Sequence, residues 1–338
     1  MNLGLASKVN IAGWLISIIL VASASSYSHA LSAIGDANAE HYALVAKWGS
    51  SGSTNGRFSA VGGIGVDALG HIYVVDRGND RIEKFESNGT FITTWGSPGT
   101  ANGQLNKIQD IGVYPCGHNL YVADSGNNRI QMFDSNGKFL RKWGSNGTGS
   151  GQFHYPEGIG VDSRQGNVYV ADTGNNRIQL FNDYGKFNTT WGSPGTANGQ
   201  FNSPEGITVD KLGHIYVVDR GNDRIQKFDS NGKFITAWGS HGINSGQFNS
   251  PEGITVDVSG NIYVADHGND RIQKFDSNGK FITAWGSQGI NNVGQFSEVA
   301  DVTVDSAGHV YVSDYGDNTV KVFGLGTNSI VVSRPASG

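Results

Sequence analysis

Short runs of β-branched and aromatic residues, separated by turns rich in Gly and Asn, fill most of this chain. In one clear stretch four such runs follow one another, at residues 206–210, 214–219, 224–229 and 233–238. Their apolar residues alternate with polar ones or form short β-branched stretches, which is typical of strands buried on one or both faces. The sequences between the runs are Lys-Leu-Gly, Gly-Asn-Asp and Ser-Asn-Gly, in which Gly and Asn accept a positive φ. The pattern predicts a small sheet of four antiparallel strands.

This four-strand unit is repeated along the chain. The motif Gly-Asn-Asp/Asn-Arg-Ile recurs every 47 or 48 residues, starting at Gly78, Gly126, Gly174, Gly221 and Gly268, with a degenerate copy at Gly316. Trp-Gly-Ser recurs with it, starting at Trp48, Trp95, Trp143, Trp191, Trp238 and Trp285. A four-stranded sheet of ~40–45 residues that is repeated around a ring is a propeller blade. The sequence therefore predicts an all-β fold, a six-bladed β-propeller of four-stranded antiparallel blades.

The Trp copies also indicate how the ring closes. Trp48 precedes the first full repeat, whereas the last repeat runs to Phe323 and lacks a strand that carries the Trp. We therefore expect residues 42–48 to supply the fourth strand of the sixth blade. Such closure removes the exposed strand edge that an open array would leave. Residues 329–333, Ser-Ile-Val-Val-Ser, are the alternative closing strand, and they lack the repeat signature.

The repeat closely resembles the NHL repeat. The resemblance is carried by Asn-Ser-Pro-Glu-Gly-Ile-Thr-Val-Asp at 202–210, Tyr-Val-Val-Asp at 216–219, Asn-Asp-Arg-Ile-Gln-Lys-Phe at 222–228 and Trp-Gly at 238–239. It covers about residues 42–323 and implies a six-bladed propeller. The family includes protein-binding and RNA-binding modules and a few lyases, so the resemblance does not by itself imply one activity.

The beginning of the chain has the features of an export segment. Lys8 precedes an apolar run at residues 11–21, which is short for a membrane span, and Ser-His-Ala at 28–30 fits a small-x-small cleavage pattern. Either a cleaved signal peptide or a retained membrane anchor would place the domain outside the cytosol, secreted or extracytoplasmic. Membrane contact would then arise only through residues 11–21, if they are retained. We expect the signal peptide or anchor at 1–30, a linker at 31–41, the propeller at 42–324 and a tail at 325–338.

Composition narrows the partners. The chain has 50 Gly but only 7 Pro, and its formal net charge is −5. Proteins that hold nucleic acid by neutralising phosphates usually show a basic excess or a basic stripe, and neither is evident. A nucleic-acid partner is therefore disfavoured. Cys116 is the only cysteine, so no intramolecular disulfide can form.

Each repeat has an Asp at the end of its second strand, and in five repeats an Arg follows five residues later. One interpretation is a ring of carboxylates that binds metal. We favour the other, an Asp that caps the turn and pairs with the Arg across one hairpin, because a feature present once per structural unit is usually architectural. Thr319 replaces the Arg in the sixth repeat, so we expect the turn after Asp314 to be held less tightly. The five pairs are Asp76 with Arg81, Asp124 with Arg129, Asp172 with Arg177, Asp219 with Arg224, and Asp266 with Arg271.

Positions that vary between otherwise near-identical repeats are better candidates for a site. One follows the strand-ending Asp, and another follows the turn into the innermost strand. In a propeller both open on the same face, where turn residues on a rigid scaffold can form a ligand surface. Relaxed surface variation with a turn-favoured Glu is the alternative interpretation, and the residues alone do not decide between the two. The candidates on this face are Glu157, Glu205, Glu252, Gln109, Arg77, Arg220, His267 and Tyr315.

Two functional hypotheses follow. The favoured one is a non-enzymatic binding or scaffold module that recognises a protein, peptide or glycan on this face. The alternative is a lyase or hydrolase centred on the channel, with a divalent cation held by Glu157, Glu205 and Glu252, the only metal candidates. The metal-dependent lyases that share this propeller place several His around the channel, whereas only His267 falls on this face here. No Ser-His-Asp or Cys-His spacing is evident either, so we assign no catalytic residue and expect no cofactor.

Overall fold

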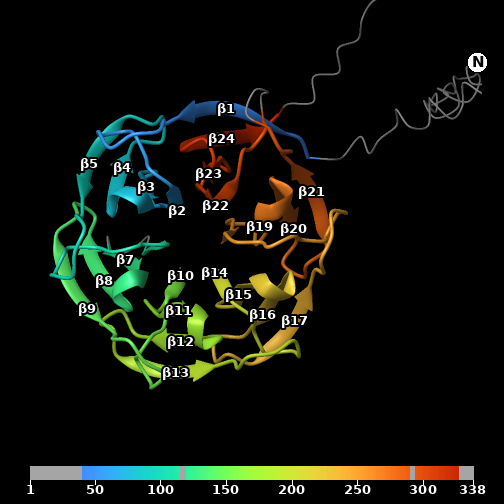
Figure 1. Cartoon of the computed structure of the whole chain (residues 1–338). Helices are drawn as coiled ribbons and strands as arrows, with labels where there is room; N and C mark the ends of the chain where they lie inside the picture. The colour runs from blue at the N-terminus through green and yellow to red at the C-terminus, as the bar shows by residue number, and fades with distance from the viewer. Residues whose placement is uncertain (1–39, 115–118, 290–293, 327–338) are drawn as a thin grey trace, which may run out of the picture. The chain divides into compact units, whose positions relative to one another are not determined.

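The computed structural model describes residues 40–114, 119–289 and 294–326. The export segment expected at 1–30, Cys116 and the alternative closing strand at 329–333 lie outside these ranges. The described residues form six four-stranded antiparallel sheets, arranged as blades around a common centre (Figure 1). The all-β six-bladed propeller is thereby confirmed. Within these ranges no helix is long and apolar enough to cross a membrane.

Each blade begins with its innermost strand and ends at the rim. The first three blades are β2 (Val61–Val66), β3 (Ile72–Asp76), β4 (Arg81–Phe85) and β5 (Phe91–Trp95); β6 (Ile111–Val113), β7 (Asn119–Asp124), β8 (Arg129–Asp134) and β9 (Phe139–Trp143); and β10 (Pro156–Val161), β11 (Val168–Asp172), β12 (Arg177–Phe181) and β13 (Phe187–Trp191). The last three are β14 (Pro204–Val209), β15 (Ile215–Asp219), β16 (Arg224–Phe228) and β17 (Phe234–Trp238); β18 (Ile254–Val256), β19 (Ile262–Asp266), β20 (Arg271–Phe275) and β21 (Phe281–Trp285); and β22 (Val299–Val304), β23 (Val310–Asp314), β24 (Thr319–Leu325) and β1 (Tyr42–Trp48).

The ring closes through its N-terminal strand. Strand β1 pairs antiparallel with β24, with Tyr42 opposite Leu325 and Trp48 opposite Val320. Side chains reinforce the pairing, since the Tyr42 ring stacks on Trp285 of the fifth blade with centroids 4.1 Å apart. The expectation that residues 42–48 complete the sixth blade is therefore confirmed. In Figure 1 β1 lies at the rim beside β24, as β5 and β9 lie at the rims of their blades.

The hydrophobic core is divided among the blade junctions. At each junction, residues of the two central strands of one blade pack against the sheet of its neighbour. The Trp of each rim strand takes part as well, as where Trp95 lies 6.3 Å from the Phe133 ring of the next blade. One of these clusters joins the sixth blade to the first through Tyr311, Val320 and Phe58. A complete circle of apolar junctions holds the blades rigidly, which matters for any site at the centre.

Short 3₁₀ turns link the second and third strands of five blades. They are η2 (Arg77–Asn79), η3 (Ser125–Asn127), η4 (Thr173–Asn175), η5 (Arg220–Asn222) and η6 (His267–Asn269). The sixth blade has a corresponding turn at Tyr315. All six turns lie on the same side of the ring as the first residues of the innermost strands, because antiparallel strands alternate in direction. We call this side the turn-lined face.

The five Asp–Arg pairs are architectural in their geometry. The Arg Nε lies 2.6–2.8 Å from the Asp Oδ2 in each of them. In the second blade Arg129 also donates to the carbonyl oxygens of Thr100, Ala101 and Gln104, and Asp124 Oδ1 accepts from the backbone N–H of Asn106. Each pair thus fastens the loop that leads into the innermost strand to the turn beside it.

The sixth blade corrects one expectation. Thr319 does replace the Arg, but the turn keeps an ion pair because Lys321 contacts the Asp314 carboxylate and donates to Gln295 O at 2.7 Å. Lys321 stands where most other blades have a Gln that donates to the same Asp, such as Gln131 to Asp124. A cation two residues further along the strand therefore compensates for the missing Arg.

Candidate functional site

All eight predicted ligand-face residues line one cavity. It has a volume of about 560 Å³ and follows the central channel, with residues of all six innermost strands in its lining. The size lies within the usual range of small-ligand sites, roughly 300–1,000 Å³. The members at the turn-lined face are Arg77, Gln109, Glu157, Glu205, Arg220, Glu252, His267 and Tyr315.

Not every blade contributes a ligand-face residue at the position after the strand-ending Asp. In the second and third blades this position holds Ser125 and Thr173, whose hydroxyls donate to the carbonyl oxygens of Pro156 and Pro204 in the following blade. These two residues brace the junction between blades instead of facing the cavity. The position therefore contributes open side chains only in the first, fourth, fifth and sixth blades.

Arg220 binds two of the three predicted Glu residues. Its Nη1 lies 3.2 Å from Glu205 Oε1 and its Nη2 lies 3.0 Å from Glu252 Oε1. The next residue round the ring is His267, whose Nδ1 lies 2.8 Å from Val299 O, so that this nitrogen donates. Its Nε2 lies 3.5 Å from Glu298 Oε1. One guanidinium and one imidazole thus organise the carboxylates of three adjacent blades.

The carboxyl groups of Glu157 and Glu205 are neighbours, and each affects the pKa of the other. Burial, followed by the charges of Glu252 and Glu157, raises the pKa of Glu205 well above its usual range. Burial also raises the pKa of Glu157 and of Glu252. Neighbouring carboxylates repel each other when both are ionised, so this pair holds a proton more tightly than a single exposed Glu does. Glu205 Oε2 is buried and has no hydrogen-bond partner among the described residues.

Arg77 lies at the equivalent position of the first blade, beside Tyr315 of the sixth. Its guanidinium carbon is 5.9 Å from the centre of the Tyr315 ring. Gly62 leaves the space that the Arg77 stem occupies, because a Cβ at Gly62 would lie 2.5 Å from Arg77 Cδ. Within the described ranges the Arg77 guanidinium makes no ion pair and no hydrogen bond. The Arg77 charge nevertheless lowers the pKa of Glu157 and of Glu252, so Arg77 is a cationic group at the channel mouth that acts on these carboxyl groups without an ion pair.

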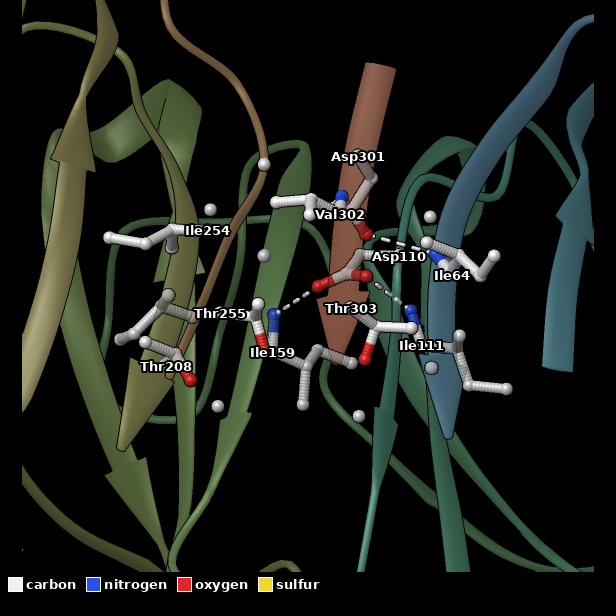
Figure 2. Close-up of a pocket in the computed structure, with 18 of the residues that line it drawn as sticks. Ile64, Asp110, Ile111, Ile159, Thr208, Ile254, Thr255, Asp301, Val302 and Thr303 are labelled. Atoms are coloured by element: carbon white, nitrogen blue, oxygen red, sulfur yellow. Dashed lines mark hydrogen bonds between the residues drawn. The ribbon is translucent and has the colours of Figure 1, made fainter. Parts of the chain in front are cut away.

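Two buried carboxylates deeper in the channel were missed by the sequence argument. Asp110 directly precedes β6. Its carboxylate accepts hydrogen bonds from the backbone N–H groups of Ile111 at 2.7 Å and Ile159 at 2.9 Å. Asp301 of β22 accepts them from Val302 at 2.8 Å and Ile64 at 2.9 Å. Figure 2 shows both side chains directed into the same part of the channel, each bonded to the backbone of the next blade.

Burial changes the acidity of both groups. It raises the pKa of Asp110 to about 6. It raises the pKa of Asp301 well above its usual range, and the negative charge of Asp110 adds to this effect. One signal in the sequence could have found them, since this position is Gly in the other four blades. A Cβ on one of these, Gly158, would collide with the carbonyl oxygen of Glu205, so the change to Asp marks a different contact between blades.

The Glu residues do not form a metal site by their arrangement. Among the described residues, no group of three or more His, Cys, Asp or Glu side chains is placed to hold a metal ion. Glu205 and Glu252 instead direct one oxygen each to Arg220. A divalent cation held by Glu157, Glu205 and Glu252 therefore does not fit this geometry, and no reaction step is derived through one.

Comparisons with known proteins agree with the fold. The family model described as NHL repeat matches residues 201–228, 248–275 and 296–323, and a model described as 6-bladed beta-propeller matches residues 102–190. No curated protein matches the sequence.

Solved structures resemble this chain in fold. A structural genomics protein of unknown function from Bacteroides thetaiotaomicron is 16% identical, with a TM-score of 0.66 over 85% of this chain and 76% of that one. A streptogramin B lyase is 14% identical, with a TM-score of 0.60 over 84% and 98% of the two chains. A gluconolactonase from Xanthomonas campestris is 14% identical, with a TM-score of 0.58 over 80% and 88%. At such identities the likeness concerns the fold alone. The chain is therefore a six-bladed β-propeller that carries NHL repeats.

Proposed function

We propose that this propeller is a non-enzymatic binding module, which recognises a protein, peptide or glycan at the channel mouth on its turn-lined face. We propose further that it acts outside the cytosol, secreted or held at a membrane through residues 11–21. The second part rests on the apolar run and the small-x-small pattern of the first 30 residues.

One observation carries the binding proposal. The blades are near-identical where they pack, and eight of the positions at which they differ line one cavity of about 560 Å³. Equivalent positions of the blades meet at the centre of the ring, so differences at these positions place unlike side chains side by side. A rigid ring that presents unlike side chains at its centre has the construction of a recognition site, because the scaffold holds each group in place before the ligand arrives.

Enzymatic activity is the competing hypothesis. Carboxyl groups of raised pKa in a cavity, such as Glu205 and Asp110, are a feature that catalytic sites share. The version of this hypothesis that needs a divalent cation has a direct test. Calorimetry of the protein with calcium, magnesium, manganese and zinc should give no heat of specific binding. Stoichiometric binding of any of these ions that is lost in Glu157→Gln, Glu205→Gln, Glu252→Gln would favour the enzyme.

Binding itself is testable on arrays of immobilised peptides and glycans. We expect the labelled full chain to bind a subset of spots. The triple variant Glu157→Gln, Glu205→Gln, Glu252→Gln should lose this binding by about ten-fold or more, the scale of one lost charge-assisted contact. The matched control is Glu86→Gln, because Glu86 is an exposed Glu in the turn between β4 and β5 on the opposite face. Equal binding by the triple variant and the control would contradict the proposal.

A further inference from the structure

The charges of the channel lining are unbalanced. Seven acidic side chains line it, namely Asp110, Glu157, Glu205, Glu252, Asp257, Glu298 and Asp301. Three Arg or Lys side chains join them, Arg77, Lys211 and Arg220. Arg220 is already shared between two of the Glu residues. Burial raises the pKa of five of these acidic groups, Asp110, Glu157, Glu205, Glu252 and Asp301. A positive group of a ligand would therefore be favoured here, because it would stabilise their ionised forms.

The carboxyl groups of Glu157 and Glu205 offer a place for that positive group. Burial raises the pKa of both neighbouring groups, and the buried Glu205 Oε2 has no hydrogen-bond partner within the described part of the chain. An ammonium or guanidinium group can donate to both carboxylates at once. Its arrival would satisfy the two groups as ions and release a bound proton to solvent.

Comparison of the repeats indicates that the ligand also carries a negative group. Arg220 of the fourth blade is flanked by Glu205 of its own blade and Glu252 of the next, and it binds both. Arg77 stands at the same position of the first blade, but there the corresponding flanking residues are Gly62 and Gln109. The same guanidinium is thus repeated without an ion pair, and its charge reaches Glu157 and Glu252 only through space. An anionic group of a ligand can form that ion pair, beside the Tyr315 ring.

We propose that the ligand is a zwitterion, such as an amino acid or a short peptide end, with its cationic group at Glu157, Glu205 and Glu252 and its anionic group at Arg77. This inference rests on the proposed binding function and narrows it to one chemical class. The two charged groups of the ligand bind on opposite sides of the mouth, with the carboxylates on the third, fourth and fifth blades and Arg77 on the first. Neutral glycans lack both charges and do not meet this requirement.

The test uses probes that differ only in charge. Straight-chain ω-amino carboxylates, roughly four to eight carbons long to suit a cavity of this class, are compared by calorimetry with alkylamines and alkylcarboxylates of equal length. At one length the ω-amino carboxylate should bind about ten-fold or more tightly than either singly charged probe. Its binding heat near neutral pH should depend on the ionisation enthalpy of the buffer, because a proton leaves the Glu157–Glu205 pair. Equal affinity for the three probe types at every length would overturn the inference.

Variants separate the two ends of the site. Arg77→Gln should abolish the preference for ω-amino carboxylate over alkylamine while leaving alkylamine binding intact. Glu157→Gln with Glu252→Gln should remove alkylamine binding. The matched control is Arg141→Gln, since Arg141 lies over the Tyr184 ring at 5.0 Å on the rim and resembles the Arg77–Tyr315 pair. An Arg141→Gln effect as large as that of Arg77→Gln would also count against the inference.

Failure of the zwitterion proposal can be distinguished from failure of the binding proposal. If the charged probes fail while array binding is still lost in the triple Glu variant, the zwitterion is wrong and the binding function stands. If array binding survives the triple variant, the binding function at this mouth is wrong whatever the probes do.

Discussion

Glu83 places a second buried carboxyl beside Asp76 in the first blade. Both side chains are fully buried, and the charge of Asp76 adds to the burial that raises the pKa of Glu83 to about 7. In the second, third, fourth and fifth blades the same position is a Gln whose Nε2 donates to the strand-ending Asp at 3.0 Å. The first blade therefore has a carboxyl group where its neighbours have a neutral donor, and Arg81 contacts both Asp76 and Glu83.

We predict that Glu83→Gln stabilises the protein, and more so as the pH rises. The pKa of Glu83 rises from its usual 4.5 to about 7 on folding, so the folded state holds a proton that the unfolded state has lost between these values. Wild-type stability then falls through this window, whereas the variant does not titrate. The gain at about pH 8 should be roughly 2–3 kcal/mol and should vanish near pH 4. Melting temperatures at both pH values measure it, and Gln131→Glu should give the reverse effect.

Removing the closing strand should expose the sixth blade. Deletion of residues 42–48 leaves the edge of β24 unpaired and takes away the Tyr42 ring that stacks on Trp285. We expect oligomers or aggregates, because an unpaired strand edge recruits other chains. Light scattering on a size-exclusion column measures this. A chain truncated after Gly326 serves as the control, and its oligomeric state should equal that of the full chain. A stable monomer from the 42–48 deletion would contradict closure of the ring by β1.

Substitutions at two glycines of nearly equal φ allow the stability cost of backbone strain to be separated from that of packing. Gly185 has φ +76° and packs on Trp143 of the preceding blade, where a Cβ would lie 2.5 Å from the indole ring. Gly151 has φ +74° and no atom near its Cβ position. Gly151→Ala should cost about 1–2 kcal/mol, the price of a left-handed conformation for a residue with a Cβ. Gly185→Ala should cost clearly more in chemical unfolding, and equal losses would show that the Trp143 contact yields easily.

We predict that Lys321 can be replaced without a large loss of stability only if the Arg and Gln of the other blades are introduced around Asp314. Lys321→Met leaves Asp314 buried without its ion pair and should destabilise the protein by about 3–5 kcal/mol. The double variant Thr319→Arg, Lys321→Gln recreates the Arg and Gln found around Asp124, and we expect it to recover most of the loss. Chemical unfolding of both variants measures the difference. A double variant as unstable as Lys321→Met would mean that the sixth blade differs from the others in more than these two positions.

Some of the site could be predicted from the sequence because the repeats align. Arg77, Gln109 and the three Glu residues stood out as differences between equivalent positions of known strand and turn type. Asp110 and Asp301 differ between repeats in the same way, but their role depends on reaching the backbone N–H groups of the next blade, at Ile159 and Ile64. Each contact joins residues that lie more than one repeat apart in the sequence, so no local sequence pattern predicts it.

The sequence by itself determined the blade, the number of blades and the closing strand, because strand alternation, turn residues and the Trp signature are all local and are repeated at a fixed period. Only the tertiary structure decided which of the varying positions meet. Closing the ring brings the first blade and the fourth to one cavity, where Arg220 makes ion pairs with two carboxylates and Arg77 acts on Glu157 and Glu252 without an ion pair. Such pairings depend on distances across the channel and on burial, which the packing of all six blades sets together.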